Sequence, residues 1–196
     1  MAELTQSVSI DNESGVAVIT VDNPPVNALS WHVRQGIFDG LNQASADGAQ
    51  AVVLICAGRT FIAGADISEF GGSVPESASL ADVQGVMENA AVPVIAAIHG
   101  TALGGGLEVA LAAHYRVGLA SSKYGLPEVN IGLLPGAGGT QRLPRLIGVP
   151  KALEAMTSGR HMPAAEAASD GLIDEMIDGD WATLRTAAIA FAERAV

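Results

Sequence analysis

The sequence predicts an α/β protein, and three features indicate this class. Apolar runs typical of strands alternate with segments of helical character along the 196 residues. The apolar fraction is 49%, supplied mostly by Ala, Val, Leu and Ile, and 23 glycines allow many tight turns. A chain of this length lies within the roughly 100 to 250 residues over which a single hydrophobic core is common. We therefore expect one domain over residues 1–196.

The first predicted elements are a β-hairpin and a helix. Strand-type sequences at residues 8–12 and 15–21 flank a short polar turn. The stretch 22–29, which contains two prolines, predicts a loop. Ser30 is expected to cap a helix over residues 31–46, because a serine side chain can accept a hydrogen bond from the first helical turn.

A buried strand, a loop and a helix come next. Residues 51–57, AVVLICA, are continuously apolar, as is typical of a strand in a sheet covered on both faces. Cys56 is expected to be a buried residue of this strand rather than a reactive thiol. The stretch 71–79, rich in Gly, Ser and Pro, predicts either a mobile loop beside a ligand or a plain surface loop. Residues 80–89 predict a helix.

The central part of the chain combines a strand, a glycine turn and a helix. Residues 93–100, PVIAAIHG, predict another buried strand, and residues 101–106, TALGGG, predict the turn. Residues 107–114, LEVALAAH, are almost uniformly apolar and predict a buried helix. A further strand is expected at residues 115–120.

The last part of the chain is mainly helical. After the segment 126–148, short helices are expected at about residues 150–157 and 163–169. A final helix is expected over residues 183–195.

Charge and hydropathy exclude several classes of partner. The net charge is −11 and no run of Lys or Arg is present, so we expect no nucleic-acid partner, because phosphate binding depends on clustered cations. An anionic group such as CoA remains compatible where a few cations, Arg59 among them, lie close to it. No window of about 18 continuous apolar residues predicts a membrane span, and residues 1–15 lack a leader pattern. We therefore expect a cytoplasmic protein with no membrane partner.

Two glutamates lie isolated in apolar sequence. Glu108 is the only charged residue in 101–113, and Glu128 is the only one in 124–139. A buried carboxylate is costly unless a neighbour or a reaction uses it, and burial raises its pKa toward the range useful for acid/base catalysis. Each glutamate alone has a structural explanation, because a first-turn carboxylate offsets the helix dipole. The pair suggests acid/base chemistry more strongly than either member does.

Two glycine-containing segments could supply backbone donors. Gly104, Gly105 and Gly106 precede a helix, where unshielded N–H groups can bind an anion or a developing oxyanion. Close packing of the helix against a strand explains the same glycines equally well. Gly64 and Ala65 form a second such segment before a short helix, and donors from the two segments together could polarise one carbonyl.

Two other motifs carry no chemistry in this interpretation. PGAGGTQR, at residues 135–142, lacks the Lys-Ser/Thr of a phosphate loop and has Gln141 where a dinucleotide motif needs glycine. His99 has no nucleophile motif to pair with and is expected to be structural. The single cysteine leaves no disulfide, and we expect no metal site.

Three long segments together resemble the crotonase superfamily, the enoyl-CoA hydratase/isomerase family. They are FIAGADISEF at 61–70, AAIHGTALGGGLEVALAAHYRV at 96–117, and YGLPEVNIGLLPGAGGTQRLPRLIG at 124–148. The likeness runs from the N-terminus to about Ile177. VDNPPVNALS at 21–30 looks most like the hydratase part of bifunctional enoyl-CoA hydratase/3-hydroxyacyl-CoA dehydrogenases. No dehydrogenase part follows, so the resemblance implies no NAD.

This resemblance implies a superhelical spiral of ββα units, usually assembled as a homotrimer or hexamer. The motif match implies that Ala65 and Gly105 donate their backbone N–H groups to the thioester oxygen, as an oxyanion hole. It also implies that Glu108 activates a water that attacks C3 of a 2-enoyl-CoA, and that Glu128 delivers a proton to C2. The product would be a 3-hydroxyacyl-CoA.

The resemblance also implies where CoA binds. The matching positions are Val26, Ala28, Arg59, Ala63, Gly64 and Ile67. Ser68 stands where many relatives have Lys, which implies a weaker hold on the phosphates. CoA enters as part of the thioester substrate, and no permanently bound cofactor is implied.

Family members usually continue with further helices beyond the position that corresponds to Val196. We therefore expect a C-terminally short form that lacks the usual helical extension over the acyl pocket. Two other functions remain open on this basis: a Δ3-Δ2 enoyl-CoA isomerase, and a truncated, weakly active acyl-CoA binding or assembly module.

Overall fold

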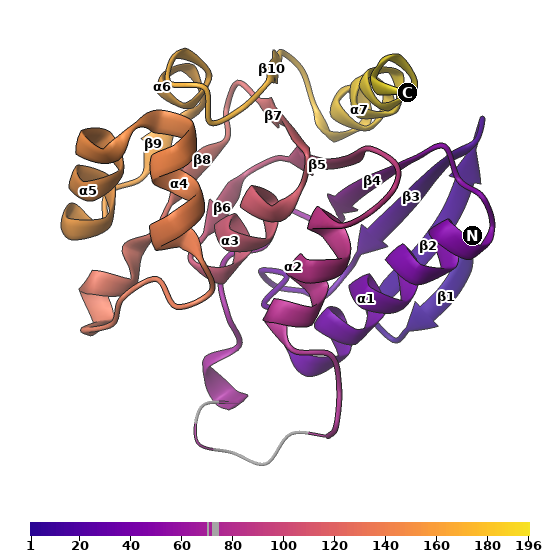
Figure 1. The fold of residues 1–196 in the computed structure, drawn as a ribbon, viewed down its shortest axis with the longest axis horizontal. Helices are drawn as coiled ribbons and strands as arrows, with labels where there is room; N and C mark the ends of the chain where they lie inside the picture. Colours follow the sequence, from indigo (N-terminus) through magenta and orange to yellow (C-terminus); the bar gives the residue numbers. More distant parts are fainter. Residues whose placement is uncertain (70, 72–74) are drawn as a thin grey trace.

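The computed structural model describes residues 1–69, 71 and 75–196 and contains two sheets (Figure 1). The larger sheet has the strand order β1-β2-β3-β4-β5-β7-β10, antiparallel from β1 to β3 and parallel from β3 onward. Its strands are β1 (Ala2–Thr5), β2 (Val8–Glu13), β3 (Val16–Val21), β4 (Ala51–Cys56), β5 (Val94–Ile98), β7 (Tyr115–Leu119) and β10 (Glu175–Ile177). The predicted hairpin is confirmed as β2 and β3.

The smaller sheet was not expected from the sequence. It consists of β6 (Thr101–Leu103), β8 (Lys123–Gly125) and β9 (Met162–Pro163), with β6 and β8 parallel. Strands this short carry too few residues for an alternating pattern to be visible. The predicted loop 71–79 includes residues 72–74, which lie outside the described residues.

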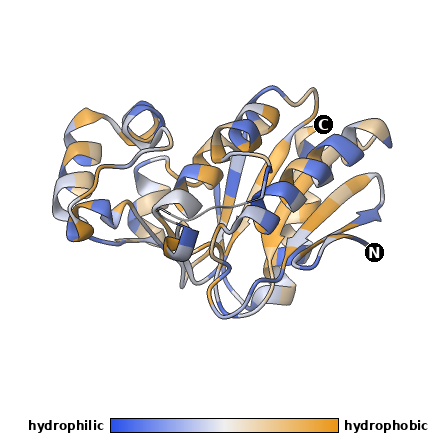
Figure 2. Ribbon diagram, turned by 90° about the horizontal axis from the view of Figure 1, so that it is seen from below, coloured by the Kyte–Doolittle hydropathy of each residue, from blue (hydrophilic) through white to orange (hydrophobic). Residues whose placement is uncertain are grey.

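Helices cover both faces of the larger sheet. On one face lie α1 (Trp31–Ala46), α2 (Leu80–Glu88) and α3 (Gly105–Ala112), and on the other lies α7 (Trp181–Ala195). Strand β4 serves both layers: Val52, Leu54 and Cys56 pack on the side of α1 to α3, and the alternate residues pack toward α7. Figure 2 shows the resulting hydrophobic band along the strands. The prediction of a strand buried on both faces, with Cys56 inside it, is confirmed.

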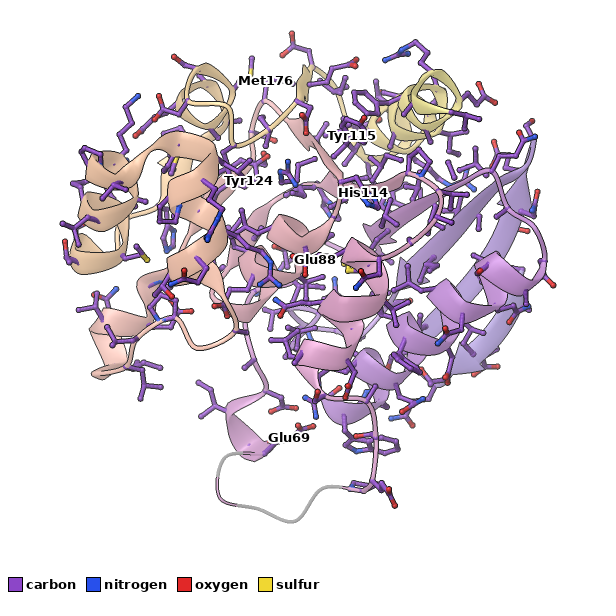
Figure 3. The ribbon with its side chains drawn as sticks, viewed as in Figure 1. Glu69, Glu88, His114, Tyr115, Tyr124 and Met176 are labelled. Carbon is purple, nitrogen blue, oxygen red and sulfur yellow. The ribbon has the colours of Figure 1, made fainter. Side chains whose placement is uncertain are left out.

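An aromatic contact joins α7 to its face of the sheet. The ring of Tyr115 on β7 meets that of Phe191 edge-on, with 5.3 Å between the ring centroids. Figure 3 shows Tyr115 beneath α7. The helix begins at Trp181, two residues before the predicted start, and Asp180 caps it by accepting a hydrogen bond from the Thr183 N–H at 2.9 Å.

Three further helices form a lobe beside the smaller sheet (Figure 1): α4 (Gly139–Ile147), α5 (Val149–Ser158) and α6 (Ala164–Ser169). Helix α4 was not expected, because it starts in glycines and contains Pro144. Two short 3₁₀ helices are η1 (Ile67–Glu69) and η2 (Pro127–Ile131). The runs β5-β6-α3 and β7-β8-α4 repeat a ββα unit, so the predicted α/β spiral is confirmed.

The prediction that the Ser30 side chain caps α1 was wrong. Ser30 occupies the N-cap position, but its hydroxyl contacts the His32 ring, 3.0 Å from Nε2. Glu69, far along the chain, supplies the cap instead, because its Oε1 accepts the Trp31 N–H at 2.6 Å. A tertiary contact has replaced the local one.

Candidate active site

Most of the predicted site residues gather around one cavity of about 500 Å³. It lies between the start of α3, the segment before η1, the turn η2 and the chain before α4. The predicted residues that line it are Ala63, Gly64, Ala65, Ile67, Gly105, Glu108 and Glu128. The remaining lining residues are mainly apolar and comprise Leu80, Leu103, Gly104, Pro127, Asn130, Ile131, Leu133, Leu134, Gly136 and Ala137.

Glu108 is held in place by the start of α4 and by the chain just before it. It sits in the first turn of α3 and is only 3% exposed. Its Oε1 accepts hydrogen bonds from the N–H groups of Ala137 at 2.8 Å and Gly139 at 2.9 Å. The glycine-rich segment 135–142, which lacks the residues of a phosphate loop, therefore orients a carboxylate. Among the described residues no hydrogen bond to Oε2 is found, so this oxygen is available in the cavity.

Gln84, which lies in none of the motifs described above, supports this arrangement. It is buried on α2, and its Nε2 donates to the carbonyl oxygens of Glu108 at 3.0 Å and Ala137 at 2.8 Å. The amide thus joins the helix that carries the carboxylate to the segment that binds it. The only sequence signal was a lone amide on the same helix face as the buried Val83 and Met87.

Glu128 has different surroundings. It follows Pro127 in η2, as predicted, and is half-buried. Its Oε2 is buried without a hydrogen-bond partner in the described part of the chain. Burial raises the pKa of Glu128, and the nearby charge of Glu108 raises it further, against a backbone hydrogen bond that lowers it. The charge of Glu108 therefore lies close enough to affect the titration of Glu128.

The two predicted oxyanion donors also meet at this cavity. A Cβ built on Gly105 would lie 3.7 Å from the Ala65 nitrogen. Neither N–H forms a hydrogen bond within residues 1–69, 71 and 75–196. Two backbone donors on one cavity can together polarise a carbonyl oxygen placed between them.

The glycines before α3 serve close packing as well. A Cβ on Gly106 would lie 2.0 Å from the Ile62 carbonyl oxygen, so any side chain there would clash with backbone. Gly104 has φ of 52°, which favours glycine, and a Cβ there would lie 3.3 Å from Glu128 Oε1. Both explanations of this segment are therefore compatible, since Gly106 packs against the neighbouring segment and Gly105 borders the cavity.

The positions predicted to bind CoA fall into two groups. Ala63, Gly64 and Ile67 line the cavity, whereas Val26, Ala28 and Arg59 do not. The two segments are nevertheless adjacent, because the Ala63 N–H donates to the Val26 carbonyl at 3.2 Å. Arg59 is exposed.

The remaining candidates lie away from the cavity. His99 does not line it, and its Nε2 lies 3.1 Å from the Gly58 carbonyl oxygen. Burial lowers the pKa of His99, which favours the neutral ring. Within the described ranges no group of three His, Cys, Asp or Glu side chains is placed to hold a metal ion. Nor does any helix there have the length and apolar character needed to cross a bilayer.

Comparison with known proteins gives consistent results. A family model described as enoyl-CoA hydratase/isomerase matches residues 11–196. The chain is 48% identical over 183 residues to a peroxisomal bifunctional enzyme of Danio rerio, covering 92% of this chain and 25% of that protein. It is 44% identical over 174 residues to a probable enoyl-CoA hydratase of Bacillus subtilis (strain 168), covering 85% of this chain and 67% of that protein. The chain thus spans about a quarter of the bifunctional relatives that it matches.

Solved structures show the same likeness. An enoyl-CoA hydratase from Bacillus anthracis superposes with a TM-score of 0.88 at 36% identity, covering 97% of this chain and 76% of that one. An enoyl-CoA hydratase from Mycobacterium tuberculosis H37Rv gives a TM-score of 0.87 at 34% identity, covering 96% of this chain and 75% of that one.

Proposed function

The chain belongs to the enoyl-CoA hydratase/isomerase family, and from that premise we propose that it adds water across the 2,3 double bond of a 2-enoyl-CoA. The product is a 3-hydroxyacyl-CoA. One observation carries the proposal: Glu108 and Glu128 line the same cavity as the backbone donors Ala65 and Gly105. Hydration needs a base, an acid and a means of stabilising charge on the thioester oxygen, and these four residues supply all three.

The proposed reaction proceeds by proton transfer at two carbons. Glu108 removes a proton from water as the water oxygen bonds to C3. Electron density moves through C2 to the thioester oxygen, where the N–H groups of Ala65 and Gly105 stabilise it. Glu128 then delivers a proton to C2, so that the elements of one water molecule are added. Donors fixed by the backbone need little reorganisation as this charge develops.

The division of roles follows from the surroundings of the two carboxyl groups. A raised pKa keeps Glu128 protonated to higher pH than an ordinary glutamate, which suits a proton donor. Two backbone N–H groups orient Glu108, which suits a group that must meet a water in one direction.

The substrate and assembly are part of the proposal. The relatives' names support a CoA thioester as substrate, within fatty acid β-oxidation. That the protein needs no permanently bound cofactor remains a prediction. A homotrimer or hexamer built from residues 1–196 remains a proposal, which light scattering at several concentrations tests. A cytoplasmic location likewise remains a prediction, since several relatives are named as peroxisomal or glyoxysomal.

The direct test follows the enoyl absorbance of crotonyl-CoA with the purified protein, beside Glu128→Gln. Loss of the signal with the unmodified protein alone supports hydration. Turnover of a 3-enoyl-CoA without hydration supports the isomerase instead, which needs only one shuttling carboxylate. Binding of CoA esters with neither reaction supports the binding or assembly module.

A further inference from the structure

The two proposed oxyanion donors are supported in different ways. Gly105 begins α3, in which every residue is buried. Ala65 is exposed and leads into η1, which has no buried residue; Ile67 is 66% exposed. Hydrophobic packing therefore fixes the Gly105 N–H, whereas the Ala65 N–H needs another source of support.

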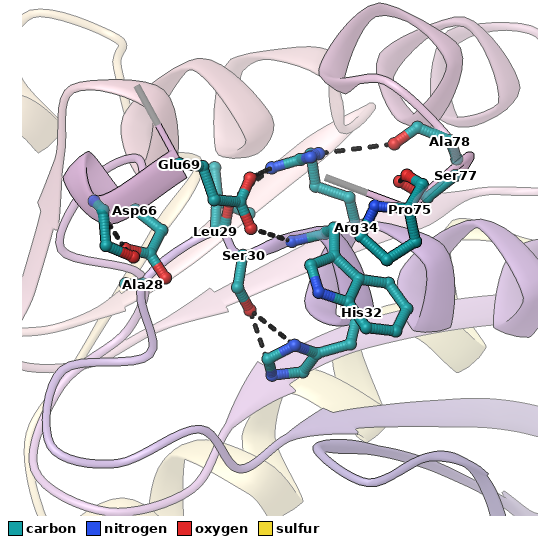
Figure 4. A network of polar contacts seen from close by, with 12 residues as sticks. Ala28, Leu29, Ser30, His32, Arg34, Asp66, Glu69, Pro75, Ser77 and Ala78 are labelled. Carbon is teal, nitrogen blue, oxygen red and sulfur yellow. Dashed lines mark hydrogen bonds and ion pairs between the residues drawn. The ribbon is translucent and has the colours of Figure 1, made fainter. Parts of the chain in front are cut away.

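A polar cluster provides contacts beside this exposed segment. The Glu69 carboxylate accepts the Trp31 N–H through Oε1 at 2.6 Å and the Arg34 Nη1 through Oε2 at 3.0 Å. The two charged side chains are only 16% and 14% exposed. Figure 4 shows the carboxylate between the start of α1 and the guanidinium group. Such shielded, charge-assisted hydrogen bonds are stronger and more directional than those on an open surface.

Arg34 extends this cluster to the segment that holds Ala65. Its Nη1 also donates to the Leu29 carbonyl at 2.7 Å, and its Nε donates to the Ala78 carbonyl at 3.3 Å (Figure 4). The Leu29 N–H in turn donates to the Gly64 carbonyl at 2.9 Å, and Leu29 and Ala65 form a parallel bridge. Arg34 thus contacts Leu29, on the segment that pairs with Gly64 and Ala65, and also Glu69, which follows Ala65 in the chain.

We propose that Arg34 and Glu69 are positioning residues that fix the Ala65 N–H at the thioester oxygen. This inference rests on the proposed function and deepens it. Neither side chain lines the cavity, so both act through Leu29 and the segment from Ala65 to Glu69. A displacement of about 1 Å in a reacting geometry can lower a rate by about 10²-fold, so loose support at this donor would be costly.

A purely structural role makes a different prediction. If the ion pair only stabilised the fold, its removal would lower the unfolding temperature while kcat of the folded protein stayed unchanged. A positioning role predicts a loss mainly in kcat, about 10- to 100-fold for Glu69→Ala, with KM changed much less. Glu69→Gln keeps an acceptor for the Trp31 N–H and should recover part of that loss.

The test measures hydrogen bonding to the thioester oxygen directly. Butanoyl-CoA, isotope-labelled at its thioester carbonyl, has no double bond to hydrate, and hydrogen bonds to its carbonyl oxygen lower the infrared stretching frequency. We expect a lowered frequency on the unmodified protein, a frequency near that of the free ligand on Glu69→Ala, and an intermediate value on Glu69→Gln. Arg34→Met should behave like Glu69→Ala.

Glu13→Gln is the matched control, because it breaks the remote Glu13–Arg185 ion pair, in which nitrogen and oxygen lie 2.7 Å apart. It should leave both kcat and the carbonyl frequency unchanged. All spectra are taken below each variant's unfolding temperature. An unchanged frequency and kcat in folded Glu69→Ala and Arg34→Met, with a lowered frequency on the unmodified protein, would overturn the proposal. No lowering on the unmodified protein would overturn the proposed function and this inference together.

Discussion

Helix α3 and the turn η2 each bring a carboxyl group to the same cavity, but they hold it differently. Glu108 on α3 is almost fully buried and accepts hydrogen bonds from two backbone N–H groups. Glu128 on η2 is half-buried and leaves Oε2 without a partner in the described structure. Glu108 is therefore fixed in orientation, whereas Glu128 has a buried oxygen with no described donor to stabilise its charge. The difference supports the proposal that the two glutamates take different parts in one reaction.

The largest loss in kcat is expected when Glu128 is replaced. Glu128→Gln keeps the shape of the side chain but removes the proton that C2 must receive, so kcat should fall about 10²- to 10⁴-fold. Steady-state hydration of crotonyl-CoA measures it. Glu154→Gln on α5 removes an exposed carboxylate that pairs with Arg160 and does not line the cavity, so it should leave kcat unchanged. A Glu128→Gln variant with full activity would remove Glu128 from the mechanism.

A loss in kcat of similar or slightly smaller size is expected when Glu108 is replaced. Glu108→Gln can still accept the N–H groups of Ala137 and Gly139, so the fold should persist while the base is lost. The double variant should be little slower than the worse single variant, because residues that act as one unit are not additive. Losses that multiply would show that the two carboxyl groups work independently.

A moderate effect should follow from loosening the support of Glu108. Gln84→Met keeps similar volume but leaves the carbonyls of Glu108 and Ala137 without this donor. We expect a kcat about 10-fold lower and a loss of about 1–3 kcal/mol in the free energy of unfolding, measured in urea. Gln43→Met on α1, where the amide donates to the exposed Asp47 carboxylate, is the control. If Gln84→Met matched the control in both measurements, the amide would have no positioning role.

A smaller effect concerns the pH dependence of the rate. The pKa of Glu128 is raised, so its protonated form persists above the ordinary range of a glutamate and is lost as pH rises through the shifted value. The rate should therefore fall on the alkaline side. In Glu108→Gln the neighbouring charge is gone, so the residual rate should begin to fall at lower pH. If the rate fell at the same pH in Glu108→Gln and in the unmodified protein, the charge of Glu108 would have no measurable effect on Glu128.

The smallest effect is on stability. A glutamate whose pKa is raised in the folded state destabilises the fold once the pH exceeds its unfolded pKa, because the folded state then holds the charge less well. Glu128→Gln should therefore unfold at a higher temperature than the unmodified protein at neutral pH. The difference should shrink as the pH falls below the ordinary pKa of glutamate. Equal unfolding temperatures throughout would mean that the charge of Glu128 is well solvated.

Local sequence patterns predicted the parts of the fold that depend on local interactions. The continuous apolar run of β4 and the periodic helix α1 are where the sequence placed them, because burial dictates their composition. Strand β1 and helix α4 were missed, since one is a short, partly exposed edge strand and the other contains proline. Such elements form because of their contacts with the rest of the fold, and the residue pattern within the segment does not reveal those contacts.

The same limit applies to the site. Glu108 and Glu128 could be found in the sequence, because a charge isolated in apolar surroundings is visible along the chain. The groups that hold the site together could not be found in this way. The donors to Glu108 are backbone N–H groups of Ala137 and Gly139. The cap of α1 is Glu69, which lies 38 residues after Trp31. Contacts between distant segments carry no local signature, so they emerge only with the fold.

The central claim is that this cavity adds water to an enoyl thioester, with Glu128 as the proton donor to C2. The most direct test incubates crotonyl-CoA with the protein in heavy water and follows the product by NMR. We expect 3-hydroxybutanoyl-CoA with one deuterium at C2, formed by the unmodified protein and not by Glu128→Gln. Folded protein that binds crotonyl-CoA yet leaves it without a C3 hydroxyl and without deuterium at C2 would contradict the claim.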